Sequence, residues 1–253
     1  LNSDRIYVMS KHLSVVIPAY NEENRIKETL ETVFNYLSRQ NYTWEVIVVS
    51  DGSKDRTVEI VSEFISNKPG ISLTANTKNH GKGYVVRQGM LQAAGEFRLF
   101  TDADNSTSIE QIEKFWPYLI DKDYDIVIGS IEVFGAKINE QAQWYRRSLG
   151  KYSKYIIRLI AGLWSIHDTQ RGFKCFTADV ASNIFSKTKI DRFGFDIEVL
   201  ALAKKMGYKV KEVPIVWDNP SDSKVSFKSY FEVLKDLFII RYYLWLNVYG
   251  IKK

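Results

Sequence analysis

Two aspartates with a single residue between them form the part of the sequence best suited to chemistry. Asp102 and Asp104 stand in "TDADNS", directly after the apolar run 96–100. Carboxylates this close repel each other, so the pair indicates either a solvated turn or a site where a cation lies between them. Mg²⁺ and Mn²⁺ prefer oxygen ligands and commonly take one or two protein carboxylates, with phosphate and water completing the shell.

Three other polar clusters also follow apolar runs. They are "PAYNEE" (18–23), "SDGSKD" (50–55) and "KNHGKG" (78–83). Taken singly, each is explained by a turn or a helix cap. Taken together with "TDADNS", they supply acids, a lysine and exposed backbone amides, which suits a nucleotide held through a metal.

The segments that must position these clusters show two hydrophobic patterns in alternation, one typical of strands and one typical of helices. Apolar β-branched runs predict buried strands, and apolar residues at helical spacing lie between them. The predicted strands are 13–17, 44–49, 71–75, 96–100 and 124–129, and the predicted helices are 22–39, 54–66, 83–94 and 108–120. Asn21 is the predicted N-cap of the first helix. This alternation predicts a mostly parallel sheet with helices on both faces, and ligands of such sheets bind beyond the carboxyl ends of the strands.

Composition narrows the classes of protein that remain. The 253 residues are 45% hydrophobic, which is enough for a sizeable core. The net charge of +5 favours anionic partners such as phosphates or a membrane surface. Cys175 is the single cysteine, so an intramolecular disulfide is excluded. No basic and aromatic RNA-binding motif is present, so we expect no nucleic acid partner.

The C-terminal stretch 227–249 combines an apolar helical stripe with aromatic and basic residues. The charges within it interrupt any membrane-spanning interpretation, since a span needs roughly 18–20 apolar residues. Two interpretations remain, a helix in the lipid headgroup region and a helix packed on the core. The stretch 144–164 allows the same two interpretations.

The motifs resemble those of glycosyltransferase family 2, whose members have the GT-A fold. Within that family, the sequence is most similar to the polyprenyl-phosphate glycosyltransferases, which include dolichyl-phosphate glucose and mannose synthases. In the first half, the motifs are "VVIPAYNEE" (15–23), "VVSDGSKDRT" (48–57), "NHGKGYVVRQGM" (79–90) and "TDAD" (101–104). In the second half, they are "DTQRGFKCF" (168–176), "FGFDIEVLALAKKMGYKVKEVPIVW" (193–217) and "DSKVS" (222–226), which look closest to the glucose synthase branch.

The resemblance implies one GT-A domain over 1–253. A Rossmann-like nucleotide-sugar-binding half would cover about 12–130 and an acceptor-binding half about 131–226, with a C-terminal amphipathic helix over 227–253. The implied reaction is an inverting, metal-dependent transfer of a sugar, with glucose from UDP-glucose the leading donor, to a polyprenyl or dolichyl phosphate. Two alternatives stay open: a GDP-mannose-dependent enzyme of the same kind, and a family 2 transferase that acts on a glycan hydroxyl. A binding protein without turnover is disfavoured, because a retired site has little reason to keep an acidic pair.

The resemblance also assigns donor-site residues. Asp102 and Asp104, with Ala103 between them, match the D-x-D element that holds the donor diphosphate through Mg²⁺ or Mn²⁺. Asp51 would accept a hydrogen bond from the base or its sugar. The remaining assignments are Pro18, Tyr20 and Glu22 at the nucleoside, and Lys82 and Lys224 beside the diphosphate.

The candidates for the acceptor-binding site are basic residues. Arg146 and Arg147 precede an aromatic, basic stretch and suit bidentate recognition of the lipid phosphate. Arg171 is a further candidate. Mannose synthases carry an arginine after the "GS" of the fifth strand, whereas Ile131 stands here, so these arginines would have to compensate.

Three acids of the second half have two possible roles. Asp168, Asp196 and Glu198 could shape the acceptor site, with Asp196 as the candidate for a catalytic role, or they could cap helices and pair with basic neighbours. We expect a peripheral protein at the cytoplasmic face of a membrane, because nucleotide sugars are made in the cytoplasm and the acceptor phosphate lies at the bilayer surface.

Overall fold

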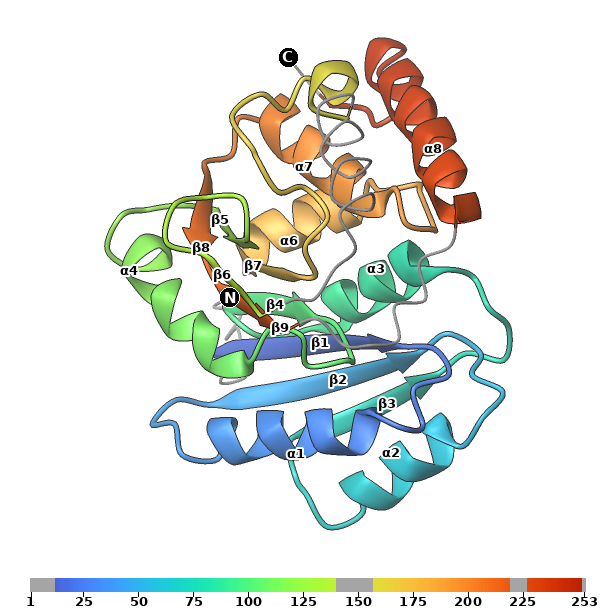
Figure 1. The fold of residues 1–253 in the computed structure, drawn as a ribbon, viewed down its shortest axis with the longest axis vertical. Coiled ribbons are helices and arrows are strands. Elements are labelled where there is room, and N and C mark those ends of the chain that lie inside the picture. The colour runs from blue at the N-terminus through green and yellow to red at the C-terminus, as the bar shows by residue number, and fades with distance from the viewer. Residues whose placement is uncertain (1–11, 140–156, 219–226, 252–253) are drawn as a thin grey trace, which may run out of the picture.

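The computed structural model describes residues 12–139, 157–218 and 227–251, and a seven-stranded sheet crosses its centre (Figure 1). The strand order is β3-β2-β1-β4-β7-β5-β8, and the strands are parallel except β7, which pairs antiparallel with both neighbours. The strands are β1 Leu13–Ala19, β2 Trp44–Ser50, β3 Ile71–Ala75, β4 Phe97–Thr101, β5 Ile126–Ser130, β7 Phe173–Thr177 and β8 Val210–Pro214. The predicted mostly parallel sheet is confirmed.

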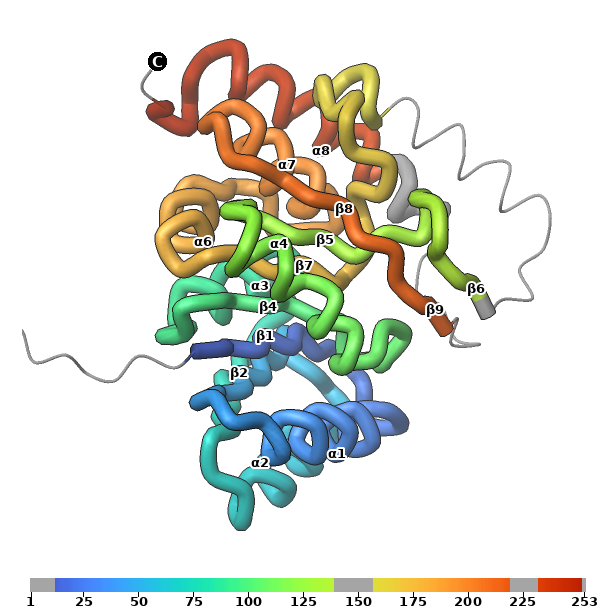
Figure 2. Tube along the Cα trace, turned by 90° about the vertical axis from the view of Figure 1, so that its left-hand side faces the viewer, coloured from blue at the N-terminus to red at the C-terminus, as the bar shows by residue number. Residues whose placement is uncertain are grey.

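A second, two-stranded sheet continues from the large one. Its parallel strands are β6 Lys137–Asn139 and β9 Val216–Asp218. Figure 2 shows them side by side at one margin of the molecule. Because β9 follows β8 after a single residue, the small sheet places Trp217 beside the carboxyl ends of the central strands.

Helices cover both faces of the large sheet, as the alternating pattern predicts. Those that pack on one face are α1 Ile26–Leu37, α2 Thr57–Ile65, the 3-10 helix η1 Ile109–Lys114 and α4 Trp116–Leu119. Those that pack on the other face are α3 Lys82–Gln92, α6 Ala178–Phe185, α7 Phe195–Lys205 and α8 Phe227–Trp245. Alternate strand residues point into the two cores: Val15 and Ile17 belong to the first and Val16 to the second.

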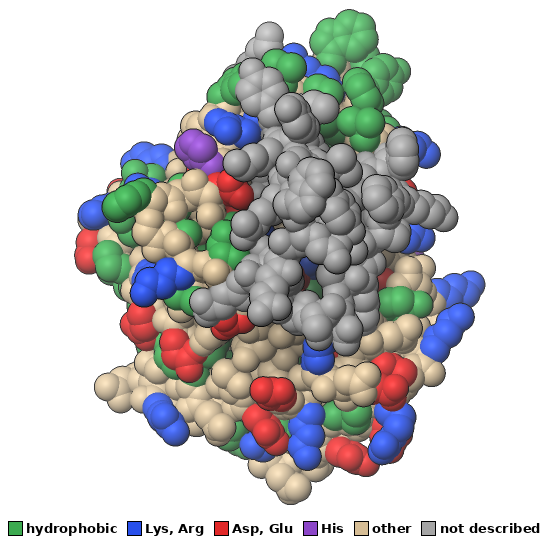
Figure 3. Space-filling view, in the orientation of Figure 1, with side chains coloured by type: hydrophobic (Ala, Val, Ile, Leu, Met, Phe, Trp, Pro, Cys, Tyr) green, Lys and Arg blue, Asp and Glu red, His purple; other side chains and the backbone are tan. Residues whose placement is uncertain are grey.

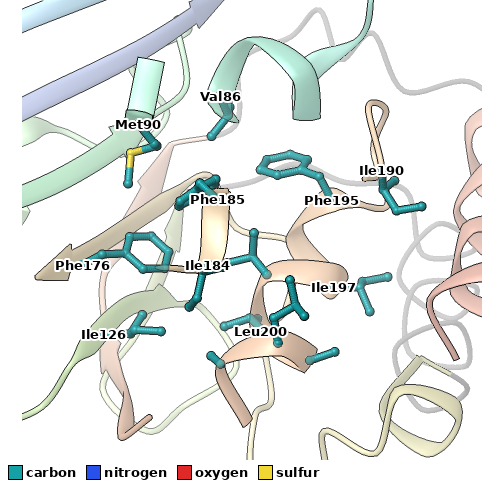
Figure 4. Close-up of a cluster of buried hydrophobic side chains, with 14 of the residues drawn as sticks. Val86, Met90, Ile126, Phe176, Ile184, Phe185, Ile190, Phe195, Ile197 and Leu200 are labelled. Carbon is teal, nitrogen blue, oxygen red and sulfur yellow. The ribbon is translucent and has the colours of Figure 1, made fainter. Parts of the chain in front are cut away.

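The second core fixes the helices that border the candidate site. Figure 4 shows side chains from α3, β5, β7, α6 and α7 converging in one cluster. Its labelled members are Val86, Met90, Ile126, Phe176, Ile184, Phe185, Ile190, Phe195, Ile197 and Leu200. This packing holds the N-terminus of α3 against the loop that precedes α7.

Two local predictions differ from the structure. The helix predicted over 108–120 forms in two pieces, a 3-10 helix and one short α-helical turn, and the break lies just before Pro117, which fits the first turn of a helix but not the interior of a continuous one. Asn21 does not cap α1, which begins at Ile26. Asn21 has φ of 52°, and its Oδ1 accepts a hydrogen bond from the amide of Lys54 at 2.8 Å, so it joins the loops after β1 and β2.

Helix α8 is apolar on two sides. Val233, Leu237 and Ile240 are buried against the second core. Another stripe stays exposed, and its residues are Leu234, Phe238, Tyr242 and Trp245. Figure 3 shows hydrophobic side chains gathered over α8 at the upper right. Within the described residues, no helix combines the length and apolarity that crossing a bilayer requires.

Candidate active site at the carboxyl edge of the sheet

A cavity of about 460 Å³ lies at the carboxyl ends of β1, β2 and β4. Its wall brings together the eight donor-site residues that the resemblance assigns within the described part of the chain: Pro18, Tyr20, Glu22, Asp51, Lys82, Asp102, Ala103 and Asp104. The second half of the chain contributes Gln170, Arg171, Gly172, Arg192, Phe193 and Trp217 to the same wall. The loops meet here because parallel strands end at the same edge of a sheet.

Asp51 builds part of this wall through hydrogen bonds. Its side chain accepts from Asn79 Nδ2 at 2.9 Å and from the amides of His80 at 2.7 Å and Gly81 at 2.8 Å. Gly81 has φ of 114°, a conformation that residues with a side chain rarely adopt. Asp51 therefore holds the start of α3 against the end of β2, and its contact with a nucleoside stays a prediction.

The acid pair lies beside a lysine from another element. Lys82 Nζ at the start of α3 is 2.6 Å from Asp102 Oδ1. Asp104 Oδ1 accepts a hydrogen bond from the amide of Ser106 at 3.0 Å, which fixes the turn after β4. Within the described residues, no three His, Cys, Asp or Glu side chains converge as a complete metal cage. A Mg²⁺ or Mn²⁺ ion that is bound to phosphate needs only one or two carboxylate ligands from the protein, and this acid pair supplies two that face the cavity.

Gly172 makes room for this arrangement. The amide of Asp102 donates to the carbonyl of Gly172 at 3.2 Å, where β4 meets the start of β7. A Cβ on Gly172 would overlap the Asp102 carboxylate, lying 2.5 Å from Oδ1 and nearer still to Oδ2. The missing side chain is therefore a condition for Asp102 to face the cavity.

The charge of Lys82 is set by the acids around it. Burial lowers its pKa, but the carboxylates of Asp102, Asp196 and Asp104 raise it by more, so the net pKa lies above the ordinary value. Lys82 is thus an ammonium at neutral pH. The cavity contains a fixed cation next to the two carboxylates that would hold a metal.

Three arginines add positive charge to the wall. Arg25 donates from Nε at 2.9 Å and Nη2 at 2.6 Å to the same Glu22 oxygen. Arg171 lies 3.4 Å from Asp168 and 4.3 Å above the Trp217 ring. Arg25 and Arg192 were not predicted as site residues from the sequence. The three-residue spacing between Glu22 and Arg25 could have indicated Arg25, whereas no local pattern indicates Arg192.

Two acids of the second half, Asp196 and Glu198, bind neighbouring groups of the protein. Asp196 is buried 2.5 Å from Lys174 Nζ, burial raises its pKa, and it is not among the residues that line the cavity. Glu198 accepts the amides of Lys189 and Ile190 and the Tyr249 hydroxyl. These contacts match the alternative in which such acids pair with neighbours and cap loops, and catalysis by Asp196 stays a prediction.

Asp168 and Ile131 are joined by a hydrogen bond. Asp168 is buried, and its Oδ2 accepts a hydrogen bond from the amide of Ile131 at 3.1 Å. The Ile131 side chain packs on the first core, so no phosphate contact comes from it. Arg146, Arg147 and Lys224 lie outside the described residues, and their roles stay predictions.

Residues 14–185 match glycosyl transferase family 2. The chain is 34% identical to a dolichyl-phosphate beta-glucosyltransferase of Trichomonas vaginalis, covering 95% of this chain and 76% of the relative. It is 33% identical to the dolichyl-phosphate beta-glucosyltransferase of Homo sapiens, covering 92% and 75%. Glucosyl-3-phosphoglycerate synthase from Mycobacterium tuberculosis, solved with Mn²⁺, UDP-glucose and phosphoglyceric acid, superposes with a TM-score of 0.69 at 15% identity, covering 96% of this chain and 81% of that one. At that identity the likeness shows the fold.

Proposed function

The chain belongs to glycosyl transferase family 2, and we propose that it transfers glucose from UDP-glucose to dolichyl phosphate. The relatives that share about a third of its sequence are named for glucosyl transfer to that lipid. The Mycobacterium tuberculosis enzyme of the same fold was solved with UDP-glucose and Mn²⁺, and ligands of such sheets bind beyond the carboxyl ends of the strands. We assign donor binding to about 12–130, acceptor binding to about 131–226, and lipid contact to the C-terminal segment 227–253, in which α8 ends at Trp245.

One observation favours a phosphate acceptor over a sugar hydroxyl. Each carboxylate that lines the cavity already has a partner: Glu22 binds Arg25, Asp51 accepts three N–H groups, Asp102 pairs with Lys82, and Asp104 accepts the Ser106 amide. A hydroxyl needs a general base to remove its proton. A lipid phosphate is already ionised at neutral pH, so it needs orientation and charge compensation rather than a base.

Asp102 and Asp104 fit a divalent cation. They offer oxygen ligands to the cavity, and the glycine at 172 leaves the space that keeps the Asp102 carboxylate turned toward it. When bound, Mg²⁺ or Mn²⁺ stabilises the negative charge on the departing nucleoside diphosphate. Lys82 adds a second positive charge on the same side. Lys224 is the further candidate for that task.

The reaction follows as a single displacement. An acceptor phosphate oxygen attacks the anomeric carbon of glucose, a new carbon–oxygen bond forms, and the bond to the β-phosphate oxygen breaks. UDP leaves with that electron pair, and the configuration inverts. Arg171, Arg146 and Arg147 are candidates to orient the attacking phosphate, because guanidinium groups bind phosphate through two parallel hydrogen bonds.

The lipid acceptor requires contact with a membrane. The exposed stripe of α8 mixes Phe238, Tyr242 and Trp245 with exposed Lys235 and Arg241, a composition that suits the headgroup region. The net charge of +5 adds attraction to anionic lipid. We assign this contact to the cytoplasmic face of a membrane, where nucleotide sugars are available.

Incubation of the purified chain with radiolabelled UDP-glucose and dolichyl phosphate in detergent tests the proposal. We expect a glucosylated lipid that forms with Mg²⁺ or Mn²⁺ and is abolished by chelator, by Asp102→Asn and by Asp104→Asn. GDP-mannose and UDP-N-acetylglucosamine serve as competing donors. Transfer to a soluble glycan hydroxyl without transfer to dolichyl phosphate would show that the proposal is wrong.

A further inference from the structure

We propose that Arg192 binds the phosphate of the lipid acceptor, an inference that rests on the proposed function. Arg192 lines the cavity and is exposed. The other three cations of the cavity wall are each held at an acid: Arg25 at Glu22, Lys82 at Asp102 and Arg171 at Asp168. Within the described residues, no hydrogen bond or ion pair of the Arg192 guanidinium is present; Asp236 of α8 interacts with its charge at longer range, so its five donors can reach a ligand.

The backbone that carries Arg192 is fixed by contacts with α3. Arg87 bridges the loop, donating to the Thr188 carbonyl at 3.2 Å and to the Asp191 carboxylate at 2.7 Å. The amide of Tyr84 donates to the Asp191 carbonyl at 3.1 Å. A Cβ on Gly81 would overlap that carbonyl and lie 2.9 Å from Arg192 Cγ. These bonds position residue 192 without using its guanidinium, so a substitution there should leave the fold intact.

The same loop touches the helix that faces lipid in the proposed function. Gly194 packs closely against α8, since a Cβ on Gly194 would lie 2.5 Å from Asp236 Cβ. Figure 1 shows the segment between α6 and α7 lying between α8 and α3. Arg192 therefore stands on the wall of the cavity that adjoins α8. A phosphate whose lipid tail remains in the bilayer would approach from this side.

The acid pair and Lys82 mark the donor side of the cavity. Asp102, Asp104 and Lys82 stand where β4 ends and α3 begins, and they suit a metal-bound diphosphate. Arg192 comes from the second half of the chain and lies beside Gly81 at the start of α3, on the side of the cavity that adjoins α8. An acceptor phosphate held there would keep an oxygen directed into the cavity, because a guanidinium binds two oxygens of a phosphate and leaves another free.

The test compares Arg192→Ala and Arg192→Lys with Arg39→Ala. Arg39 is an exposed arginine just after the C-terminus of α1 and is not among the residues that line the cavity, so its replacement removes one positive charge without touching the site. Two acceptors are used: a short-chain, water-soluble prenyl phosphate, and dolichyl phosphate in phosphatidylcholine vesicles. Calorimetry measures UDP binding in Mn²⁺ for each protein.

We expect Arg192→Ala to raise the KM for both acceptors at least tenfold, because a charge-assisted hydrogen bond is lost. UDP affinity should stay within twofold of the wild type, and Arg192→Lys should recover part of the loss. An equal fall in UDP affinity would assign Arg192 to the donor diphosphate and would overturn the inference. A loss of transfer confined to dolichyl phosphate in vesicles would assign Arg192 to the membrane surface and would also overturn it. Unchanged KM values also overturn it. A wild-type chain that glucosylates neither acceptor would instead refute the proposed function.

Discussion

Gly172→Ala should disable the acid pair without removing a charge. The new Cβ would lie 2.5 Å from Asp102 Oδ1, while a normal contact between such atoms needs about 3.5 Å, so the carboxylate has to move by about 1 Å. The Asp102 side chain is 34% exposed, so it can turn away without disturbing the core. A misplacement of about 1 Å in a catalytic arrangement can cost about a hundredfold in rate. That factor corresponds to about 2.7 kcal/mol in the activation free energy.

The assay measures kcat with UDP-glucose and dolichyl phosphate, Mn²⁺ affinity in the presence of UDP, and the melting temperature. We expect kcat to fall about a hundredfold and Mn²⁺ binding to weaken in parallel, with a small change in melting temperature. Gly207→Ala is the control: Gly207 has φ of 82° after α7 and nothing within 4 Å, so the substitution strains the backbone by about 1–2 kcal/mol and spares the cavity. If Gly172→Ala keeps wild-type kcat and Mn²⁺ affinity, the position of Asp102 does not govern the reaction.

Three further predictions concern other parts of the molecule. Asp51→Ala should weaken UDP binding tenfold or more in calorimetry, because the loop 79–81 loses its shared acceptor and each bond to a charged group contributes about 1.5–3 kcal/mol; unchanged affinity would contradict this. Tyr249→Phe should lower the free energy of unfolding by about 1–3 kcal/mol, since the buried Glu198 carboxylate loses a donor at 2.8 Å. Denaturant titration checks this, and a neutral result would mean that another donor replaces the hydroxyl. Joint replacement of Phe238 and Trp245 by serine should reduce flotation with anionic vesicles while leaving UDP binding unchanged, because both side chains are exposed. Equal flotation of the variant would exclude the α8 stripe as the lipid contact.

The fold was predictable where burial alone decides the local structure. The five strands predicted from apolar β-branched runs all exist, with ends that coincide or shift by at most two residues. The predictions that differ from the structure fall where a local feature competes with the pattern. The helix expected over 108–120 is broken just before Pro117, and Asn21 uses its side chain to join two loops rather than to cap α1.

The second half of the chain was less predictable because its polar residues have both local and distant partners. Glu198 and Asp196 stand in one motif, yet each is held by residues from other elements. No sequence pattern states whether a carboxylate points toward a cavity or into the core. Strand β7, which runs against its neighbours, also had no signature that separates it from a parallel strand.

The sequence by itself determined which chemistry was available. Asp102 and Asp104 are two residues apart, and their position after an apolar run already places them at a strand end, because hydrophobic period is a local property. Only the tertiary structure decided which groups meet them. Lys82 comes from 20 residues away, while Arg192 reaches the same cavity from a loop held against α3 and α8. Such encounters depend on strand order and on glycines that allow close approach, so they arise when distant elements pack together.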